Sequence, residues 1–187
     1  MSAVGEREVL LTGIGGQGVQ LAARVLAEAA VLDGLEVQLF ASYGGMMRGG
    51  RTDATVVIGD GPIDAPPVVA AAWAVVGMHH DHLADPLSRL RDDGVALLND
   101  AVVPVEDFPT PPTATRIALP FTTVAHEAGN PMAGSLVAVG LLAAHTGVVA
   151  LGSLIGAVEV ALPPYRQQHV ASSIAAIEAG AGLVVAA

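Results

Sequence analysis

Cysteine and lysine are both absent from this 187-residue chain, and each absence excludes a group of functions. Without cysteine the chain forms no disulfide, no thiolate nucleophile and no cysteine-ligated zinc or iron–sulfur centre. Without lysine it has no Walker lysine, no Schiff-base lysine and no lysine general base. If the protein takes part in electron transfer, we therefore expect the metal centres to lie on another chain.

Positive charge is also scarce, because the eight basic residues are all arginines and face 18 acidic residues, for a formal net charge of -10. Binding to nucleic acid needs clustered positive charge, so we expect no nucleic-acid partner. Residues 1–8 are charged and lack the apolar run of a signal peptide, which predicts a cytoplasmic protein. The length fits one domain that spans residues 1–187.

The longest stretch without a charged side chain covers residues 128–158. The run His145-Thr146-Gly147 is typical of a helix end and divides this stretch into helices over about 132–144 and 151–160. At ~1.5 Å per residue, the first is about 20 Å long, too short to cross a hydrocarbon core. We therefore predict two buried helices and no membrane partner. Three glycines would allow close backbone approach: Gly134, Gly140 and Gly152.

Strand-like and helix-like runs alternate along the chain. The predicted strands cover residues 8–12, 36–40, 53–58, 71–77, 95–98 and 116–119. The predicted helices cover residues 19–30, 81–91, 132–144, 151–160 and 167–179, and a proline-containing surface segment covers 103–115. This alternation predicts an α/β fold: a single Rossmann-like domain with a mostly parallel sheet, helices on both faces and a helical C-terminus.

The first motif, Gly13-Ile14-Gly15-Gly16-Gln17-Gly18, matches GxGxxG between the first predicted strand and the first predicted helix. Such glycines allow a tight turn and bring backbone N–H groups close to an anion, which the helix N-terminus also favours. Close packing of helix and strand is the alternative role. NAD requires an acidic residue at the end of the second strand, where Phe40-Ala41-Ser42 stands instead. The expected ligand-binding residues are Gly13, Gly15, Gly16, Gln17 and Gly18.

The second motif, residues 42–51, follows the second predicted strand at the carboxyl edge of the sheet, where open α/β sheets bind ligands. Its four glycines and two arginines form a cationic loop suited to phosphates or carboxylates. The alternative is a wide turn whose arginines pair with surface carboxylates. The expected ligand-binding residues are Ser42, Tyr43, Arg48, Gly49 and Gly50, whereas Arg51 is expected to pair with surface acids.

The two motifs, in this order and at this spacing, resemble the gamma subunit, or gamma domain, of 2-oxoacid:ferredoxin (acceptor) oxidoreductases. That family, of the pyruvate, 2-ketoisovalerate, indolepyruvate and phenylglyoxylate type, shows G-x-G-G-Q-G-V and then Y-G-x-E-x-R-G-G. Residues 63–67, 94–99 and 125–130 extend the agreement over nearly the whole chain. Met46 or Met47 replaces the glutamate of the second motif. Gly134, Ser135 and Ser173 stand where the family commonly has asparagines.

The resemblance implies a gamma-type domain without a catalytic residue of its own, in an enzyme that oxidatively decarboxylates a 2-oxoacid, usually to an acyl-CoA. It places thiamine diphosphate on alpha/beta-type subunits and the iron–sulfur clusters that lead to ferredoxin on a further subunit. This chain would close over the thiamine site or help to hold coenzyme A. Gly59-Asp60-Gly61 resembles the start of a thiamine-binding motif but lacks the asparagine that completes it, so we interpret it as a hairpin turn.

Two alternative functions remain at this point. One is a free-standing nucleotide-binding module of Rossmann type, acting as a small oxidoreductase or a sensor. The other is a structural subunit that has lost ligand binding. The apolar C-terminal helices predict burial against a partner subunit, which favours the complex over the free-standing module.

Histidines near the end of the fourth predicted strand offer a further candidate site. His79, His80 and His82 could bind zinc or titrate near neutral pH. We expect His79 and His80 to face different ways, and Asp81 to cap the helix that follows, so no metal site is predicted. His126 and Glu127 are also expected to be exposed and apart, because neighbouring helical residues do not face each other.

Overall fold

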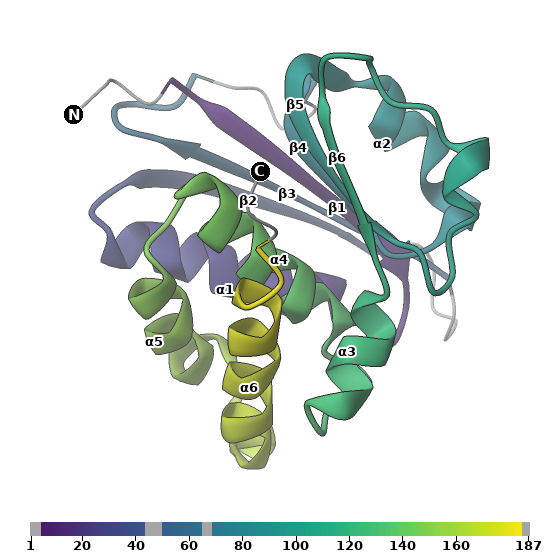
Figure 1. The fold of residues 1–187 in the computed structure, drawn as a ribbon. Helices are drawn as coiled ribbons and strands as arrows, with labels where there is room; N and C mark the ends of the chain where they lie inside the picture. The colour runs from purple at the N-terminus through teal and green to yellow at the C-terminus, as the bar shows by residue number, and fades with distance from the viewer. Residues whose placement is uncertain (1–4, 44–49, 65–68, 185–187) are drawn as a thin grey trace.

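The computed structural model describes residues 5–43, 50–64 and 69–184, and its centre is a six-stranded sheet in the order β2-β3-β1-β4-β5-β6 (Figure 1). The strands are β1 (Arg7–Ile14), β2 (Glu36–Tyr43), β3 (Arg51–Gly59), β4 (Ala72–Gly77), β5 (Leu90–Asn99) and β6 (Thr115–Leu119). Neighbours pair in parallel from β1 to β6, whereas β3 is antiparallel to both β1 and β2. Every strand except β3 thus runs in one direction, which confirms the mostly parallel sheet.

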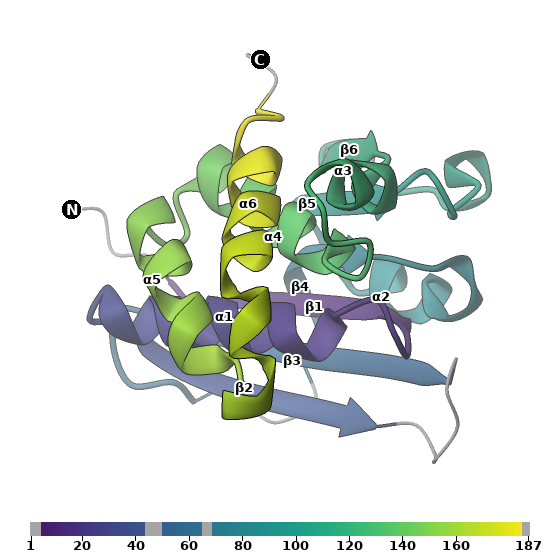
Figure 2. The ribbon, with the colours of Figure 1, turned by 90° about the horizontal axis from the view of Figure 1, so that it is seen from below.

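Five helices cover one face of the sheet (Figures 1 and 2). They are α1 (Val19–Leu32), α3 (Phe121–Glu127), α4 (Gly134–Thr146), α5 (Leu151–Ala161) and α6 (Val170–Ala181), the last preceded by a 3₁₀ segment, Pro164–His169. Among the described residues, the helical segments on the other face are α2 (Ala84–Ser88) and the 3₁₀ turns His80–His82 and Val105–Asp107. Helices on both faces are therefore confirmed, with very unequal cover.

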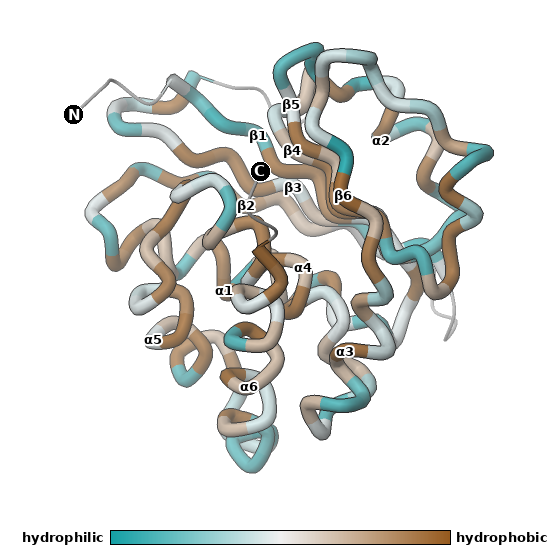
Figure 3. The backbone as a smooth tube through the Cα atoms, in the orientation of Figure 1, coloured by the Kyte–Doolittle hydropathy of each residue, from teal (hydrophilic) through white to brown (hydrophobic). Residues whose placement is uncertain are grey.

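Hydrophobic residues follow this layering (Figure 3). The larger core lies between the five helices and the sheet, and a smaller core lies under α2 and the segment 101–114. The first ten residues of α4 are all buried, as predicted for this uncharged stretch. The same prediction is wrong for α5, which buries only Leu154, Ala157, Val158 and Ala161 and exposes part of its surface. In the part of the chain that the structure describes, no helix combines the length and the apolar character needed to cross a bilayer.

Small residues let α4 and α6 approach closely. A Cβ atom added to Gly140 would lie 2.2 Å from the carbonyl oxygen of Ile177, and one added to Gly180 would lie 1.9 Å from that of Val137. The close approach predicted at Gly140 is confirmed. The same expectation for Gly152 is wrong, because no heavy atom of the residues that the structure describes lies within 4 Å of the added Cβ.

Two local predictions are wrong because long-range pairing decides the structure, and one helix was not predicted. The helix expected over 81–91 ends at Ser88, since Ala72 N–H bonds to the Arg89 carbonyl at 2.7 Å and draws the chain into β5. Helix α3 was not predicted as an element. Gly59 to Gly61 do not form a hairpin, because β1 lies between β3 and β4 and the chain must cross over.

Candidate functional site

The two glycine-rich motifs meet at one edge of the sheet. The carboxyl ends of β1 and β2 lie on the same side of it, and β3 begins there. Gly15 N–H donates a hydrogen bond of 2.9 Å to the Gly50 carbonyl. Ser42 and Tyr43 end β2, whereas Arg48 and Gly49 lie outside the described residues. The structure thus joins the first motif to the end of the second.

The first motif needs glycine at several positions. Gly16 and Gly18 have φ of +107° and +76°, which side chains of L residues rarely adopt. Gly18 is also the N-cap of α1, and an added Cβ would lie 2.7 Å from the Met132 carbonyl oxygen. At Gly13 an added Cβ would lie 2.6 Å from Gln17 Oε1. The tight turn predicted for this motif is present.

The Gln17 side chain connects the loop to the end of β1 and to Met78, which directly follows β4. Its Oε1 accepts from Ile14 N–H at 2.9 Å, and its Nε2 donates to the Met78 carbonyl at 3.0 Å. Ser135 Oγ, on α4, donates to the Gln17 carbonyl at 2.7 Å. Ser135 stands where the family commonly has an asparagine, and here its hydroxyl holds the loop from the helix side.

Backbone N–H groups of the loop divide into two sets. Those of Ile14, Gly15 and Gln17 are bonded within the protein, the last to the Ile14 carbonyl at 3.2 Å. Those of Gly16 and Gly18 donate to no acceptor among the described residues. Because Gly16 is exposed and Gly18 begins α1, these two amides are the ones that an anion can approach.

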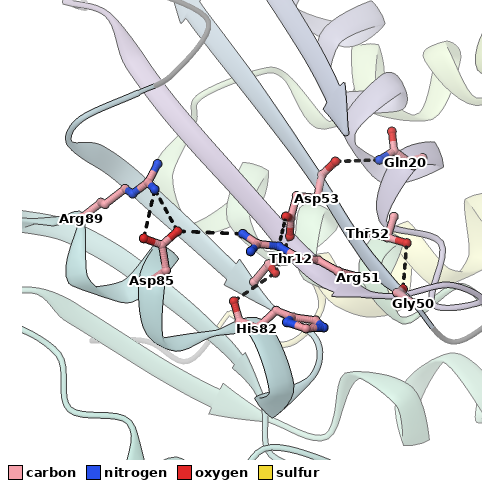
Figure 4. A network of polar contacts seen from close by, with 9 residues as sticks. All are labelled: Thr12, Gln20, Gly50, Arg51, Thr52, Asp53, His82, Asp85 and Arg89. Carbon is pink, nitrogen blue, oxygen red and sulfur yellow. Dashed lines mark hydrogen bonds and ion pairs between the residues drawn. The ribbon is translucent and has the colours of Figure 1, made fainter. Parts of the chain in front are cut away.

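Asp53 joins the loop region to the base of the second motif (Figure 4). Thr12 Oγ1 donates to Asp53 Oδ1 at 2.7 Å, and Gln20 Nε2 on α1 donates to the Asp53 carbonyl at 2.7 Å. Arg51 Nε donates to the other carboxylate oxygen of Asp53. The pairing of Arg51 with an acid is confirmed. Asp53 itself was not predicted, because its partners come from three separate elements.

The polar network continues on the face of the sheet that carries α2 (Figure 4). Arg51 Nη2 lies 3.9 Å from Asp85 Oδ2, and Arg89 Nη2 lies 2.8 Å from the same oxygen. These charges border a cavity of about 270 Å³ whose other lining residues are Leu10, Leu11, Thr12, Ala54, Thr55, Val69 and Pro86. Since both arginines are paired with aspartates, the cavity offers an anion no unpaired cation among the described residues.

Asn99 connects the end of β5 to α3. It is fully buried, and its Nδ2 donates to Thr122 Oγ1 at 2.7 Å and to the Met78 carbonyl at 3.3 Å, while its Oδ1 accepts from Thr122 N–H at 3.2 Å. A buried amide with all these partners is a positioning residue. In the sequence, Asn99 stood out only as the end of segment 94–99, which resembles the family, and no role was predicted for it.

His79 and His80 were expected to face different ways, which is wrong. Their rings stack with centroids 4.3 Å apart and planes inclined by 25°. Asp81 was also expected to be the N-cap, which is wrong. The N-cap is His79, whose Nδ1 accepts from Asp81 N–H at 3.3 Å. Burial lowers the pKa of His79, and the neighbouring His80 lowers it further. His126 and Glu127 are exposed at the end of α3, as predicted.

Comparison with known proteins relates the chain to one family. Residues 8–183 match the model of the pyruvate ferredoxin/flavodoxin oxidoreductase family. The 2-oxoglutarate synthase subunit KorC of Methanothermobacter marburgensis is 33% identical over 96% of this chain and 97% of that protein. The pyruvate synthase subunit PorC of the same organism is 34% identical over 83% of this chain and 86% of that protein.

Solved structures agree with this relation. The gamma subunit of keto/oxoacid ferredoxin oxidoreductase from Geobacter sulfurreducens superposes with a TM-score of 0.77 at 29% identity, covering 96% of both chains. A 2-oxoglutarate:ferredoxin oxidoreductase from Magnetococcus marinus has a TM-score of 0.80 over 98% of this chain and 32% of its own; at 16% identity it shows the shared fold alone. The chain therefore belongs to the pyruvate ferredoxin/flavodoxin oxidoreductase family and corresponds to the gamma subunits of its 2-oxoacid:ferredoxin oxidoreductases.

Proposed function

We propose that this chain acts within a thiamine diphosphate-dependent complex that oxidatively decarboxylates a 2-oxoacid, and that it carries no complete active site. Thiamine diphosphate would be bound by alpha/beta-type subunits, and the iron–sulfur clusters by a further subunit. The lack of cysteine supports this division, since a cluster ligated by thiolates cannot form here. Asn99 supports it too, because its side-chain amide already donates to the Met78 carbonyl and to Thr122 Oγ1. It is therefore not available as the asparagine that would complete a thiamine-binding motif.

The hydrogen bond from Gly15 N–H to the Gly50 carbonyl carries the proposal for the site, since it joins both family motifs at one sheet edge. We assign to residues 13–18 and 42–50 the binding of an anionic group of coenzyme A or of the 2-oxoacid. Gly16 and Gly18 would supply backbone N–H groups at the start of α1, and Arg48 a guanidinium. Arg51 has a different role, because it is paired with Asp53.

Assembly is tested by purification of the tagged chain from its native host at low salt. We expect thiamine-binding and iron–sulfur subunits to copurify, and the complex to oxidise a 2-oxoacid. Subunits are identified by mass spectrometry, and the bound cofactors by extraction. Recovery of a stable monomer that is active alone would instead support the free-standing nucleotide-binding module.

The assignment of the loop is tested on the assembled complex with two arginine variants. Arg48→Ala should weaken binding of an anionic ligand by roughly tenfold to a hundredfold, because a charge-assisted hydrogen bond contributes ~1.5–3 kcal/mol. Arg51→Ala is the matched control, and loss of its exposed ion pair should cost ~0–1 kcal/mol and little affinity.

Steady-state kinetics, with the 2-oxoacid and coenzyme A varied separately, show which anion Arg48 meets. A raised KM for coenzyme A alone would identify the coenzyme as its ligand. If both variants keep every kinetic constant and the same subunit stoichiometry, the loop is not a ligand site.

A further inference from the structure

Two buried serines in the helical layer differ in what their hydroxyl groups contact. Ser135, on α4, is 0% exposed, and its Oγ donates to the Gln17 carbonyl oxygen at 2.7 Å. Ser173, on α6, is 1% exposed, and its Oγ has no hydrogen-bond partner among the described residues. Burial of a hydroxyl group costs free energy unless the group is hydrogen-bonded. Only the hydroxyl of Ser135 is therefore bonded to the glycine-rich loop, and Ser173 provides a natural comparison.

The carbonyl that Ser135 contacts belongs to the same peptide group as Gly18 N–H. No peptide bond in the described part of the chain is cis, and in a planar trans peptide the C=O and N–H groups point in opposite directions. Because the Ser135 hydroxyl holds the carbonyl toward α4, it turns Gly18 N–H away from α4. This amide is one of the two in the loop that donate to no acceptor among the described residues.

Glycine at position 18 makes this orientation depend on the serine. A peptide group rotates through the ψ of the residue before it and the φ of the residue after it, and glycine accepts a wide range of φ. The N–H and the side chain of Gln17 are held by Ile14 and Met78, but these bonds do not involve the Gln17 carbonyl. Without the hydroxyl of Ser135, the carbonyl would lose this partner and the peptide would be free to turn.

The same hydrogen bond makes Gly18 N–H a better donor. A hydrogen bond accepted by a carbonyl polarises its peptide group and strengthens the bond that the N–H makes on the other side. Gly18 is also the N-cap of α1, which has no side-chain cap and no acidic residue in its first turn. The partial positive charge of this helix end is thus not neutralised by a residue of the helix itself.

We propose that Ser135 is a positioning residue for the anion site, because its hydroxyl holds the Gln17–Gly18 peptide with Gly18 N–H directed at the bound phosphate or carboxylate. Ser135 is fully buried, so it acts through the peptide and does not touch the anion. The inference rests on the proposed function for the presence of an anion, whereas the orientation of the peptide is tested without one.

Titration of the ¹⁵N-labelled full chain with inorganic pyrophosphate, followed by NMR, tests the role of Ser135. In the parent we expect saturable shifts of the Gly16 and Gly18 amide signals. Ser135→Ala should bind pyrophosphate roughly fivefold more weakly, as expected when one hydrogen bond no longer orients the donor. Ser173→Ala removes the hydroxyl without a partner and is the matched control, with the affinity of the parent.

The ligand-free spectra give a second reading. The Gly18 amide signal should move in Ser135→Ala and stay in place in Ser173→Ala. Ser135→Thr keeps the hydroxyl and should restore both the signal and the affinity. Thermal unfolding shows whether each variant keeps its fold.

The outcomes separate the inference from the proposed function. If the parent binds pyrophosphate, an affinity of Ser135→Ala within twofold of the parent overturns the role of Ser135. A folded Ser135→Thr that loses as much affinity as Ser135→Ala overturns it as well. If the parent shows no saturable shift, the anion site itself is refuted. An unchanged Gly18 signal in ligand-free Ser135→Ala then overturns the peptide orientation too, whereas a moved signal supports that orientation alone.

Discussion

Glycine permits close backbone contact in two regions of this protein, and the physical reasons differ. Between α4 and α6, Gly140 and Gly180 have ordinary helical backbones, so only the missing side chain matters. In the first motif, Gly18 has a positive φ, and a Cβ added to it would also lie 2.7 Å from the Met132 carbonyl oxygen. Both regions thus require glycine, the helix pair for space alone and the loop for space and backbone conformation together.

This difference indicates which glycines are candidates for ligand binding and which are explained by packing. The contact of α4 with α6 is buried and explained completely by packing. The loop of residues 13–18 has the same kind of contact at Gly18, but Gly16 is exposed, and among the described residues its added Cβ would meet Met132 Cε alone, at 4.0 Å. A series of glycine-to-alanine variants separates contact, backbone conformation and ligand binding.

Gly180→Ala should have the largest effect on stability. A methyl group 1.9 Å from the Val137 carbonyl oxygen must push α4 and α6 apart, which we expect to lower the free energy of unfolding by about 3 kcal/mol. Urea denaturation of the full chain, followed by circular dichroism, measures the loss. A loss well under ~1 kcal/mol would show that the helix pair relaxes easily.

Gly18→Ala should come next, with a loss of about 2–3 kcal/mol. The positive φ costs roughly 1–2 kcal/mol, and displacement of the Met132 carbonyl adds to it. Gly147→Ala is the control, because Gly147 has a φ of +66° but nothing within 4 Å of an added Cβ. Equal losses in the two variants would remove the contact with Met132 from the explanation.

Gly16→Ala should cost about 1–2 kcal/mol of stability, for its positive φ alone. If Gly16 N–H contacts an anion, the same variant should weaken binding of coenzyme A or the 2-oxoacid to the assembled complex at least tenfold. Calorimetry on the complex and urea denaturation of the chain give the two readings. Unchanged affinity would assign this glycine to backbone conformation only.

Gly152→Ala should have the smallest effect, and of opposite sign. Gly152 is exposed within α5 and an added Cβ meets nothing within 4 Å, so alanine should stabilise the helix by about 0.5–1 kcal/mol. The same denaturation series measures it. Destabilisation would indicate that this surface is packed in a way that the isolated chain does not show.

Much of the fold was predictable because its signals are local. All six strands were found, since short apolar runs rich in β-branched residues favour extended structure wherever they lie. Every strand except β4 was predicted too short, as at β5, where pairing with β4 continues beyond the apolar run to Leu90. Helix α3 was missed because its seven residues are held by the buried ring of Phe121 and by Asn99.

The sequence by itself determined the glycine-rich turn, the family and the absence of thiolate and lysine chemistry, because these depend on residue type and close spacing. Only the tertiary structure decided the partners of Asp53 and Asn99, and the stacking of His79 on His80. Asp53 is bonded to residues 41 and 33 positions away, at Thr12 and Gln20. Such pairs form only after strand order and register bring the elements together, and no local pattern encodes that choice.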